Sequence, residues 1–396
     1  MEMSELTALL TREGLTLLDE LGPVTSAAEV ARAVSRLRAA GHSPDLVSAV
    51  VGQARLRVKA QPKFGEFAER MLFTRAGLEQ ATRLPIATLH AVRLRQAGIT
   101  AVADLGCGIG GDSLAFAGAG IRVDAVDADE VTAAIAAYNL SVFGDEARVR
   151  QAFAEEALPD DPAVAVWLDP ARRTAGHSET RRVAASDYSP SLDWAFDVAA
   201  SRPTGIKLGP GLDRDLIPAD VEAQWVSDAG SVVELVLWSG ALSREGVRRA
   251  ALVVRDGEVH ELTAPADADD VEVRELGAFV HEPDGAVIRA RLIGEAARML
   301  DAGMLDPQIA YLTGDAALTS PFVQSFRVRE VLSAHPKAIN QALRANDIGR
   351  LEIKKRGMDI DPASFRRKLT LKGSQATTLI LTRTPSGRVA ILADRV

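Results

Sequence analysis

The stretch that decides the fold is Asp104-Leu-Gly-Cys-Gly-Ile-Gly-Gly-Asp112. A short apolar run, residues 101–103, precedes it, and the helical pattern Ser113-Leu-Ala-Phe-Ala117 follows it. The glycines therefore lie where a strand turns tightly into a helix, and glycine lets such a turn approach a ligand closely. A strand, a glycine turn and a helix in this order indicate a nucleotide-type cofactor site in an α/β fold.

The glycines alone do not identify the cofactor. Gly106, Gly108 and Gly111 satisfy the dinucleotide fingerprint, and Asp127 stands 19 residues after Gly108, where a ribose-binding carboxylate belongs. NAD or another nucleotide therefore stays open, as does a turn that serves only packing. Asp104 tilts the choice, because an acid beside the loop suits an ammonium group and would repel a pyrophosphate.

Outward from the loop, short apolar runs alternate with helical segments. The runs are residues 122–127, 163–168 and 205–208, and this alternation predicts a parallel sheet covered by helices on both faces. Residues 232–238 and 249–255 are separated by a short loop, which favours an antiparallel hairpin over a crossover. We expect a mostly parallel sheet with an antiparallel last strand.

The chain before this sheet has the apolar spacing of helices. Ser26 is placed to cap one of them, and a further helix is expected over residues 67–83. We expect four parts, which are a helical domain at 1–97, a Rossmann-like domain at 98–262, a connecting segment with a bridging helix at 263–320, and a small basic domain at 321–396.

Composition narrows the class of protein. A chain of 396 residues with 47% hydrophobic and 25% charged residues is expected to form more than one globular domain. No apolar run approaches the roughly 20 residues of a membrane span, and the first residues lack signal-peptide features, so we expect a cytoplasmic protein. The single cysteine, Cys107, leaves no disulfide or multi-cysteine metal site, and the six histidines lack metal-ligand spacing. We expect no bound metal, and Cys107 is interpreted as a small filler of the loop.

Charge is unevenly distributed along the chain. Residues 321–396 carry 15 Lys and Arg against 6 Asp and Glu, whereas the remaining 320 residues carry 31 against 48. Basic residues form two groups in this part of the chain. The first group is Lys354, Lys355 and Arg356, and the second group is Arg366, Arg367, Lys368 and Lys372. Such groups suit phosphate binding, although a charged run is also typical of a solvated face.

A second motif, Trp167-Leu-Asp-Pro-Ala-Arg-Arg173, ends the fourth expected strand, at the sheet edge where doubly wound folds bind ligands. Asp169 and Pro170 are the candidate reaction centre. The alternative is that they only end a strand and begin a turn.

The glycine loop with its two acids resembles the class I methyltransferase pattern. This resemblance implies S-adenosylmethionine as cofactor, with Asp104 at the methionine end and Asp127 on the ribose hydroxyls. It leaves open whether Phe153 or Glu155 stands near the adenine. The candidate cofactor residues are Asp104, Gly106, Cys107, Gly108, Gly110, Asp127, Ala128 and Glu155.

The second motif resembles the Asp-Pro-Pro-aromatic motif of methyltransferases that modify exocyclic base nitrogens. The resemblance implies that Asp169 and a neighbouring backbone carbonyl orient the acceptor amine, whose delocalised lone pair makes it a poor nucleophile. Ala171 and Arg172 stand where that family has proline and an aromatic residue. Stacking on the base would then need another group, such as the guanidinium of Arg172 or Arg173, and the same two arginines are candidates for RNA contact.

Residues 98–255 together resemble methyltransferases related to trimethylguanosine synthases, and residues 351–383 resemble the THUMP-like domain attached to such enzymes. The implied fold is a Rossmann-like class I methyltransferase sheet with an N-terminal helical domain and a small α+β THUMP-like domain. The implied substrate is a base nitrogen, guanine favoured, in structured RNA such as tRNA or rRNA. Two rivals remain, a methyltransferase for small molecules or proteins, and a non-catalytic RNA-binding protein that keeps the fold.

Overall fold

The computed structural model describes residues 1–172 and 185–396, and of Arg172 only the main chain. The chain divides into two compact units. One comprises Met1–Leu208 with Leu237–Ser243, and the other comprises Gly209–Val236 with Arg244–Val396. Each unit is described by itself.

The first unit begins with helices, as the apolar spacing predicts. Ser26 accepts a hydrogen bond from the main-chain N–H of Glu29 and caps its helix as expected. The single helix expected over residues 67–83 is wrong, because residues 71–74 are non-helical and only a short helix follows them. The helices are α1 (Met3–Leu9), α2 (Arg12–Leu21), α3 (Ala27–Ala39), α4 (Pro44–Phe64), α5 (Arg75–Gln80) and α6 (Leu84–Gln96).

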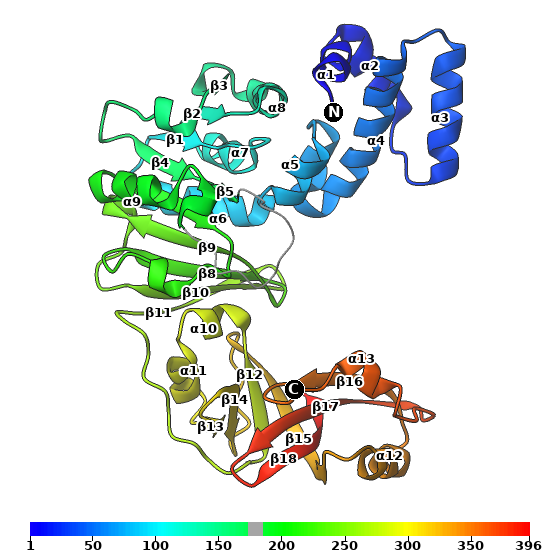
Figure 1. Ribbon diagram of the computed structural model, residues 1–396, viewed down its shortest axis with the longest axis vertical. Helices are drawn as coiled ribbons and strands as arrows, with labels where there is room; N and C mark the ends of the chain where they lie inside the picture. Colours follow the sequence, from blue (N-terminus) through cyan, green and yellow to red (C-terminus); the bar gives the residue numbers. More distant parts are fainter. Residues whose placement is uncertain (173–184) are drawn as a thin grey trace. The chain divides into compact units, whose positions relative to one another are not determined.

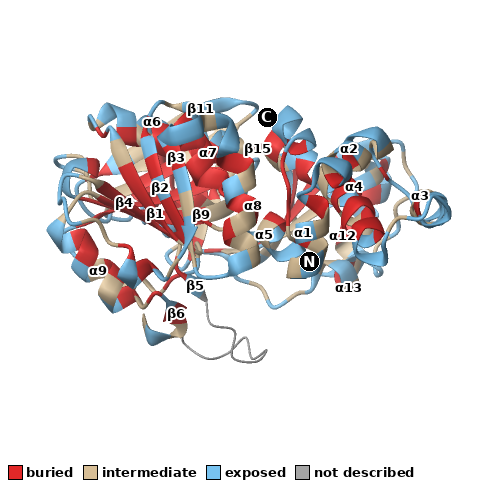
Figure 2. Ribbon diagram, turned by 90° about the horizontal axis from the view of Figure 1, so that it is seen from above, coloured by how far each residue is buried: buried red, intermediate tan, exposed pale blue. Residues whose placement is uncertain are grey.

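Five parallel strands carry the glycine loop, and the expected apolar runs form four of them. Their order is β7-β4-β1-β2-β3, with Leu105 paired to Leu168 and Leu168 paired to Ile206. Figure 1 shows α7 and α8 on one side of these strands and α9 on the other, and Figure 2 shows β1 and β4 buried between them. The elements are β1 (Ala101–Leu105), α7 (Gly111–Gly118), β2 (Arg122–Asp127), α8 (Glu130–Leu140), β3 (Ala147–Gln151), β4 (Ala165–Leu168), β5 (Ala171–Arg172), β6 (Tyr188–Ser189), α9 (Leu192–Ser201) and β7 (Thr204–Leu208).

The sheet continues through β9, β8, β10 and β11, in the full order β11-β10-β8-β9-β7-β4-β1-β2-β3. The hairpin expected between residues 232–238 and 249–255 is therefore wrong, because β8 lies between those strands. Ala229 and Gly230, both at positive φ, instead form a two-residue turn that makes β8 and β9 the antiparallel hairpin. The strands are β8 (Glu222–Asp228), β9 (Ser231–Ser239), β10 (Arg249–Arg255), parallel to β8, and β11 (Glu258–Ala264), antiparallel to β10.

A second sheet of seven strands, in the order β13-β14-β12-β15-β18-β17-β16, lies in the second unit. Three of its strands come from residues 279–314, within the expected connecting segment. Its pairs are antiparallel except for the parallel β16 and β17. The elements are β12 (Phe279–Pro283), α10 (Gly285–Arg289), α11 (Ile293–Met299), β13 (Gly303–Asp306), β14 (Ile309–Gly314), β15 (Val323–Ser333), α12 (Pro336–Ala345), β16 (Ile348–Lys355), α13 (Pro362–Arg366), β17 (Gln375–Thr384) and β18 (Gly387–Arg395).

Within the described parts of the chain, the helices are too short or too polar for any of them to cross a bilayer.

Candidate active site

The glycine loop depends on backbone conformations that side chains disfavour. Gly106, Gly108 and Gly110 have φ values of 104°, 55° and 86°, in the left-handed region that glycine adopts without strain. The main-chain N–H groups of Gly106 and Cys107 both donate to the carbonyl of Val126, at 2.9 Å each. The loop is thereby fixed against the carboxyl end of β2, and α7 begins directly after it.

Asp104 is a buried carboxylate at the end of β1. Its Oδ2 accepts a hydrogen bond from Ser113 Oγ at 2.5 Å, whereas its Oδ1 is buried and has no hydrogen-bond partner among the described residues. Burial raises the pKa of Asp104 to about 8. A buried oxygen without a donor fits the ammonium group of a methionine moiety, which would supply the missing hydrogen bond.

Asp127 ends β2 beside the same loop. Its Oδ2 accepts from the N–H of Gly108 and its Oδ1 from the N–H of Asp129, both at 3.0 Å, while burial raises its pKa. Each oxygen keeps a further lone pair for a ribose hydroxyl. Two main-chain N–H groups thus fix the carboxylate beside the glycine loop.

The segment after β3 returns to this edge. Ala152 donates its N–H to the carbonyl of Asp127 at 3.1 Å, and Gln151 Nε2 donates to the carbonyl of Ala128 at 3.2 Å. Phe153 and Glu155 follow, and both are exposed. The phenyl ring of Phe153 is exposed, and an exposed ring of this kind can stack on a planar base.

Cys107 has the properties of a loop filler. It is buried, and burial raises the pKa of its thiol well above the usual value. A thiol in this state is a weak nucleophile.

Asp169 follows β4, and the strand register places it next to Lys207 of β7. Lys207 Nζ lies 2.6 Å from Asp169 Oδ2. The Asp169 side chain is 38% exposed, whereas that of Lys207 is 10% exposed. Sequence reasoning missed Lys207, although a lysine inside the apolar run 205–208 was a usable signal.

The Lys207 ammonium also contacts two buried groups. It donates to Thr82 Oγ1 at 2.7 Å and lies 3.3 Å from Asp112 Oδ2. Asp112 in turn accepts from Thr82 Oγ1 and contacts His90 Nδ1, both at 2.8 Å. Burial opposes ionisation of Asp112, but Lys207 and His90 outweigh it and hold the pKa of Asp112 well below its usual range.

Residues that precede the sheet in the sequence pack against the glycine loop and stabilise it. Asn139 of α8 bonds both the N–H and the carbonyl of Leu72, at 2.8 and 3.0 Å, and donates to the carbonyl of Ile109 at 2.9 Å. A Cβ atom on Gly77 would lie 2.5 Å from Ile109 Cγ2, so α5 packs closely on the same loop. Neither contact was foreseen from the sequence.

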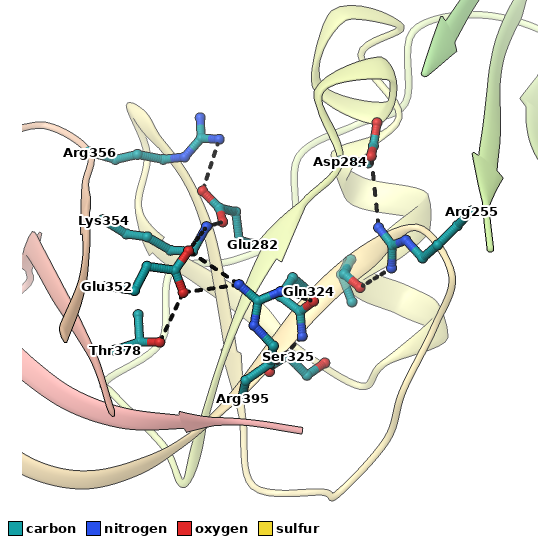
Figure 3. Close-up of polar contacts among 11 residues, drawn as sticks. Arg255, Glu282, Asp284, Gln324, Ser325, Glu352, Lys354, Arg356, Thr378 and Arg395 are labelled. Carbon is teal, nitrogen blue, oxygen red and sulfur yellow. Dashed lines mark hydrogen bonds and ion pairs between the residues drawn. The ribbon is translucent and has the colours of Figure 1, made fainter. Parts of the chain in front are cut away.

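The first basic group of the C-terminal sheet is engaged within the unit. Lys354 Nζ lies 2.6 Å from Glu282 Oε2, and Arg356 lies 3.4 Å from the other oxygen of Glu282 (Figure 3). These strands are far apart in the sheet order, so the sheet curls until β16 reaches β12. Lys355 is exposed between the two paired cations.

The second basic group is more open. Arg366 donates to the carbonyl of Leu351 and Arg367 to Ser364 Oγ, which are neutral partners. All four cations of this group are exposed, and they are Arg366, Arg367, Lys368 and Lys372. Arg173 lies outside the described residues, as does the side chain of Arg172.

Asn340 of α12 joins that helix to this segment, since it bonds the carbonyl of Lys368 at 3.0 Å and the N–H of Thr370 at 2.7 Å. Exposed Lys337 and Arg344 on α12 add to the cations of this face.

Known proteins resemble this chain along most of its length. An uncharacterized S-adenosylmethionine-dependent methyltransferase of Mycobacterium tuberculosis strain H37Rv is 35% identical over 363 residues, which span 90% of this chain and 97% of the relative. A relative in strain CDC 1551 has the same description and the same identity.

The crystal structure of a proposed methyltransferase from Porphyromonas gingivalis W83 has the same fold, with a TM-score of 0.74 at 19% identity, over 94% of this chain and 100% of that one. The sequence profile of a THUMP domain-like family matches residues 323–395, and that of a domain of unknown function matches residues 2–60. The expected fold class, a methyltransferase-like α/β sheet with N-terminal helices and a THUMP-like C-terminal domain, is confirmed.

Proposed function

This chain belongs to the S-adenosylmethionine-dependent methyltransferases and carries a THUMP-like C-terminal domain, and we propose that it methylates an exocyclic base nitrogen in structured RNA. The observation that carries the proposal is Asp169, a partly exposed carboxylate at the carboxyl edge of the sheet, held at 2.6 Å by Lys207. The resemblance of residues 98–255 to trimethylguanosine synthases favours guanine, in tRNA or rRNA.

The cofactor supplies a methyl group on a positively charged sulfur, which becomes a neutral thioether when the methyl leaves. Asp104 would hold its ammonium group through the unpartnered Oδ1, and Asp127 would hold its ribose hydroxyls. Gly106, Cys107, Gly108 and Gly110 form the turn that lets the backbone approach it, while Ala128 with Phe153 or Glu155 would border the adenine.

Asp169 and the Pro170 backbone would orient the acceptor. An aromatic amine shares its lone pair with the ring, so much of the rate must come from alignment. An ionised carboxylate that accepts the amine N–H would fix the direction of the nitrogen lone pair. The amine nitrogen gains a carbon and must lose one proton, for which Asp169 or solvent is the acceptor.

The basic tail would supply contacts to RNA phosphates. The exposed cations Arg366, Arg367, Lys368 and Lys372 make no ion pair in the part of the chain that the structure describes, and they support this role most strongly. Lys355 is exposed as well, whereas Lys354 and Arg356 are partly neutralised by Glu282. A methyltransferase acting on a small molecule would have no need of such a surface.

The test is mass spectrometry of nucleosides in total RNA from cells with and without the gene, followed by transfer of labelled methyl to the RNA that lacks it. Loss of one N-methylated nucleoside is expected without the gene. Asp169→Ala should abolish transfer to that RNA while cofactor affinity stays within a few fold. S-adenosylhomocysteine should raise the thermal midpoint and NAD should not.

Unchanged nucleosides would overturn the RNA proposal. Cofactor binding without transfer to any RNA would then favour the non-catalytic rival, which the altered Asp-Pro-Ala-Arg sequence suggests. Labelling of protein or of a small-molecule fraction would favour the other rival. Equal loss of cofactor binding and of transfer in Asp169→Ala would assign a structural role to Asp169.

A further inference from the structure

Lys207 is an ammonium group placed inside a strand, where its charge is costly. Its side chain is 10% exposed, and a buried charge persists only where partners replace its water. Among the described residues, oxygen atoms of Asp169 at 2.6 Å, Thr82 at 2.7 Å and Asp112 at 3.3 Å do so. The lysine therefore has a fixed position, set by groups on three separate segments of the chain, which are the loop before α6, the start of α7 and the end of β4.

The partners of Lys207 differ in exposure. The Asp112 side chain is 7% exposed and is held by His90, whose ring lies 4.6 Å from that of buried Trp167. Asp169 is 38% exposed at the edge of the sheet. The network thus runs from a rigid buried anchor to a carboxylate that a bound molecule can reach.

We propose that Lys207 is a positioning residue for methyl transfer, which keeps Asp169 ionised and oriented to accept the N–H of the acceptor amine. The inference rests on the proposed function of Asp169. An ammonium at 2.6 Å stabilises the charged carboxylate, which only accepts hydrogen bonds, whereas the protonated form also presents an O–H donor. Lys207 itself neither gains nor loses a proton, and Asp112 with Thr82 holds it in place.

The first test compares Lys207→Met and Lys207→Gln, which remove the charge, with Lys207→Arg, which keeps it. Full-length protein is given labelled S-adenosylmethionine and total RNA from cells that lack the gene. The neutral variants should lose kcat on the order of a hundredfold, with cofactor KM within a few fold. The carboxyl groups of Asp104 and Asp127 also face Asp169 and oppose its ionisation. Without the ammonium Asp169 is therefore protonated more easily, and the acid limb of the pH profile of these variants should move to higher pH. Lys207→Arg should keep the acid limb where the parent has it.

Lys63→Met is the matched control. Lys63 is a partly buried lysine that bonds the main-chain carbonyls of Leu78, Glu79 and Ala81 at 2.7 to 2.8 Å. Its loss should lower the thermal midpoint. Because the charge of Lys63 also acts on Lys207, the variant should move the acid limb far less than the neutral Lys207 variants do. A neutral Lys207 variant that is destabilised but has the parent's pH profile would show that the lysine is only structural.

The second test is a double-mutant cycle with Asp169→Asn. If Lys207 acts through Asp169, then Lys207→Gln should cause no further loss of kcat in the Asp169→Asn background, whereas multiplied losses overturn the inference.

A measurement without RNA separates this inference from the proposed function. The infrared carboxylate band that Asp169→Asn removes should titrate at higher pH in Lys207→Gln than in the parent. Unchanged titration overturns the inference even if RNA methylation is found, and a shifted one supports it even if the RNA substrate is wrong.

Discussion

Asp104 and Asp112 lie at the two ends of one loop, yet their surroundings shift their pKa values in opposite directions. Asp104 has a single hydroxyl donor, from Ser113, and burial raises its pKa to about 8. Asp112 is equally buried, but Lys207, His90 and Thr82 surround it and its pKa is held well below the usual range. The loop therefore presents an acid that is neutral at pH 7 without ligand, backed by one that stays ionised.

The pH dependence of cofactor binding should reveal Asp104. Pairing with the ligand ammonium requires the ionised carboxylate, so binding releases a proton below pH 8. Affinity for S-adenosylhomocysteine should then rise by up to about tenfold per pH unit as pH approaches 8 from below, measured by calorimetry at pH 6, 7 and 8. Asp104→Asn should show weak, pH-independent affinity. A parent affinity that does not change over this range would exclude Asp104 from the ammonium site.

The raised pKa of Asp104 also makes the free energy of unfolding depend on pH. The pKa of Asp104 is raised from an ordinary value of 3.8 to about 8, so between these values the folded state holds a proton that the unfolded state has lost. The contribution of Asp104 to the free energy of unfolding therefore falls as pH rises through this window. Urea unfolding without ligand should show Asp104→Asn gaining stability relative to the parent from pH 5 to pH 8. A constant difference would mean that Asp104 titrates at its ordinary pKa.

Asp127 offers a comparison with a neighbouring acid on the same strand. Asp127→Ala should weaken S-adenosylhomocysteine binding by about 1.5–3 kcal/mol, the usual worth of hydrogen bonds to a charged group. Asp124 is exposed on β2 and lies 4.0 Å from Arg150, so Asp124→Ala should leave the affinity unchanged. Equal affinities for both variants and the parent would remove Asp127 from the cofactor site.

At the scale of elements, local signals predicted the glycine loop and four of the five parallel strands around it. Contacts between residues far apart in the sequence decided much of the rest. Glycine at positive φ and short apolar runs act over a few residues, and both were readable. The helix expected over residues 67–83 is interrupted because Gln53 bonds Phe73 and Asn139 bonds Leu72 from distant positions. The sequence of β8 contains polar residues, so it was not recognised as a buried strand. The hairpin was therefore expected between β9 and β10. Lys207 and Asp112 meet only through the fold, so their partnership was not visible in either motif.

Substitution of Asn139 should destabilise the protein, because Asn139 joins the segment before α5 to the glycine loop. Asn139→Ala leaves the Leu72 N–H, the Leu72 carbonyl and the Ile109 carbonyl without this partner. Each unsatisfied buried group costs about 1–3 kcal/mol, and partial relaxation should leave a loss of about 2–4 kcal/mol in the free energy of unfolding. Cofactor affinity should fall as well, because Ile109 belongs to the loop.

Asn346→Ala is the control for that variant, since Asn346 makes similar bonds at the partly exposed end of α12. Its effect on stability should be small and its effect on cofactor affinity absent. Equal stability of both variants would mean that the Asn139 bonds do not hold the loop.

At the scale of the whole molecule, the net charge of -8 opposes association with RNA. The net charge of +9 in residues 321–396 can overcome this only where its cations are exposed and not already paired with carboxylates. The two basic groups of the THUMP-like domain differ in how far carboxylates neutralise their cations. Lys354 and Arg356 share Glu282, whereas Arg366 and Arg367 donate hydrogen bonds to neutral oxygens. The Asp361 carboxylate feels the charge of Arg367 but does not form an ion pair with it. Residues 366–372 thus hold a dense run of exposed cations that make no ion pair in the described part of the chain.

The salt dependence of RNA binding should follow this difference. Each phosphate contact contributes roughly 0.7–0.9 to the slope of log affinity against log salt. Replacing Arg366, Arg367 and Lys368 together by alanine should flatten the slope by about two to three units, because three unneutralised cations are lost. Replacing Lys354, Lys355 and Arg356 together should flatten it by only about one unit, since Glu282 cancels part of that charge, and should lower stability by leaving Glu282 unpaired. Filter binding of bulk tRNA between 50 and 200 mM salt would measure both slopes, with S-adenosylhomocysteine affinity as the check that the first unit is intact. Parent-like slopes in both variants would make the tail a solvated face, and an equal effect of the two groups would show that RNA displaces Glu282 from Lys354 and Arg356.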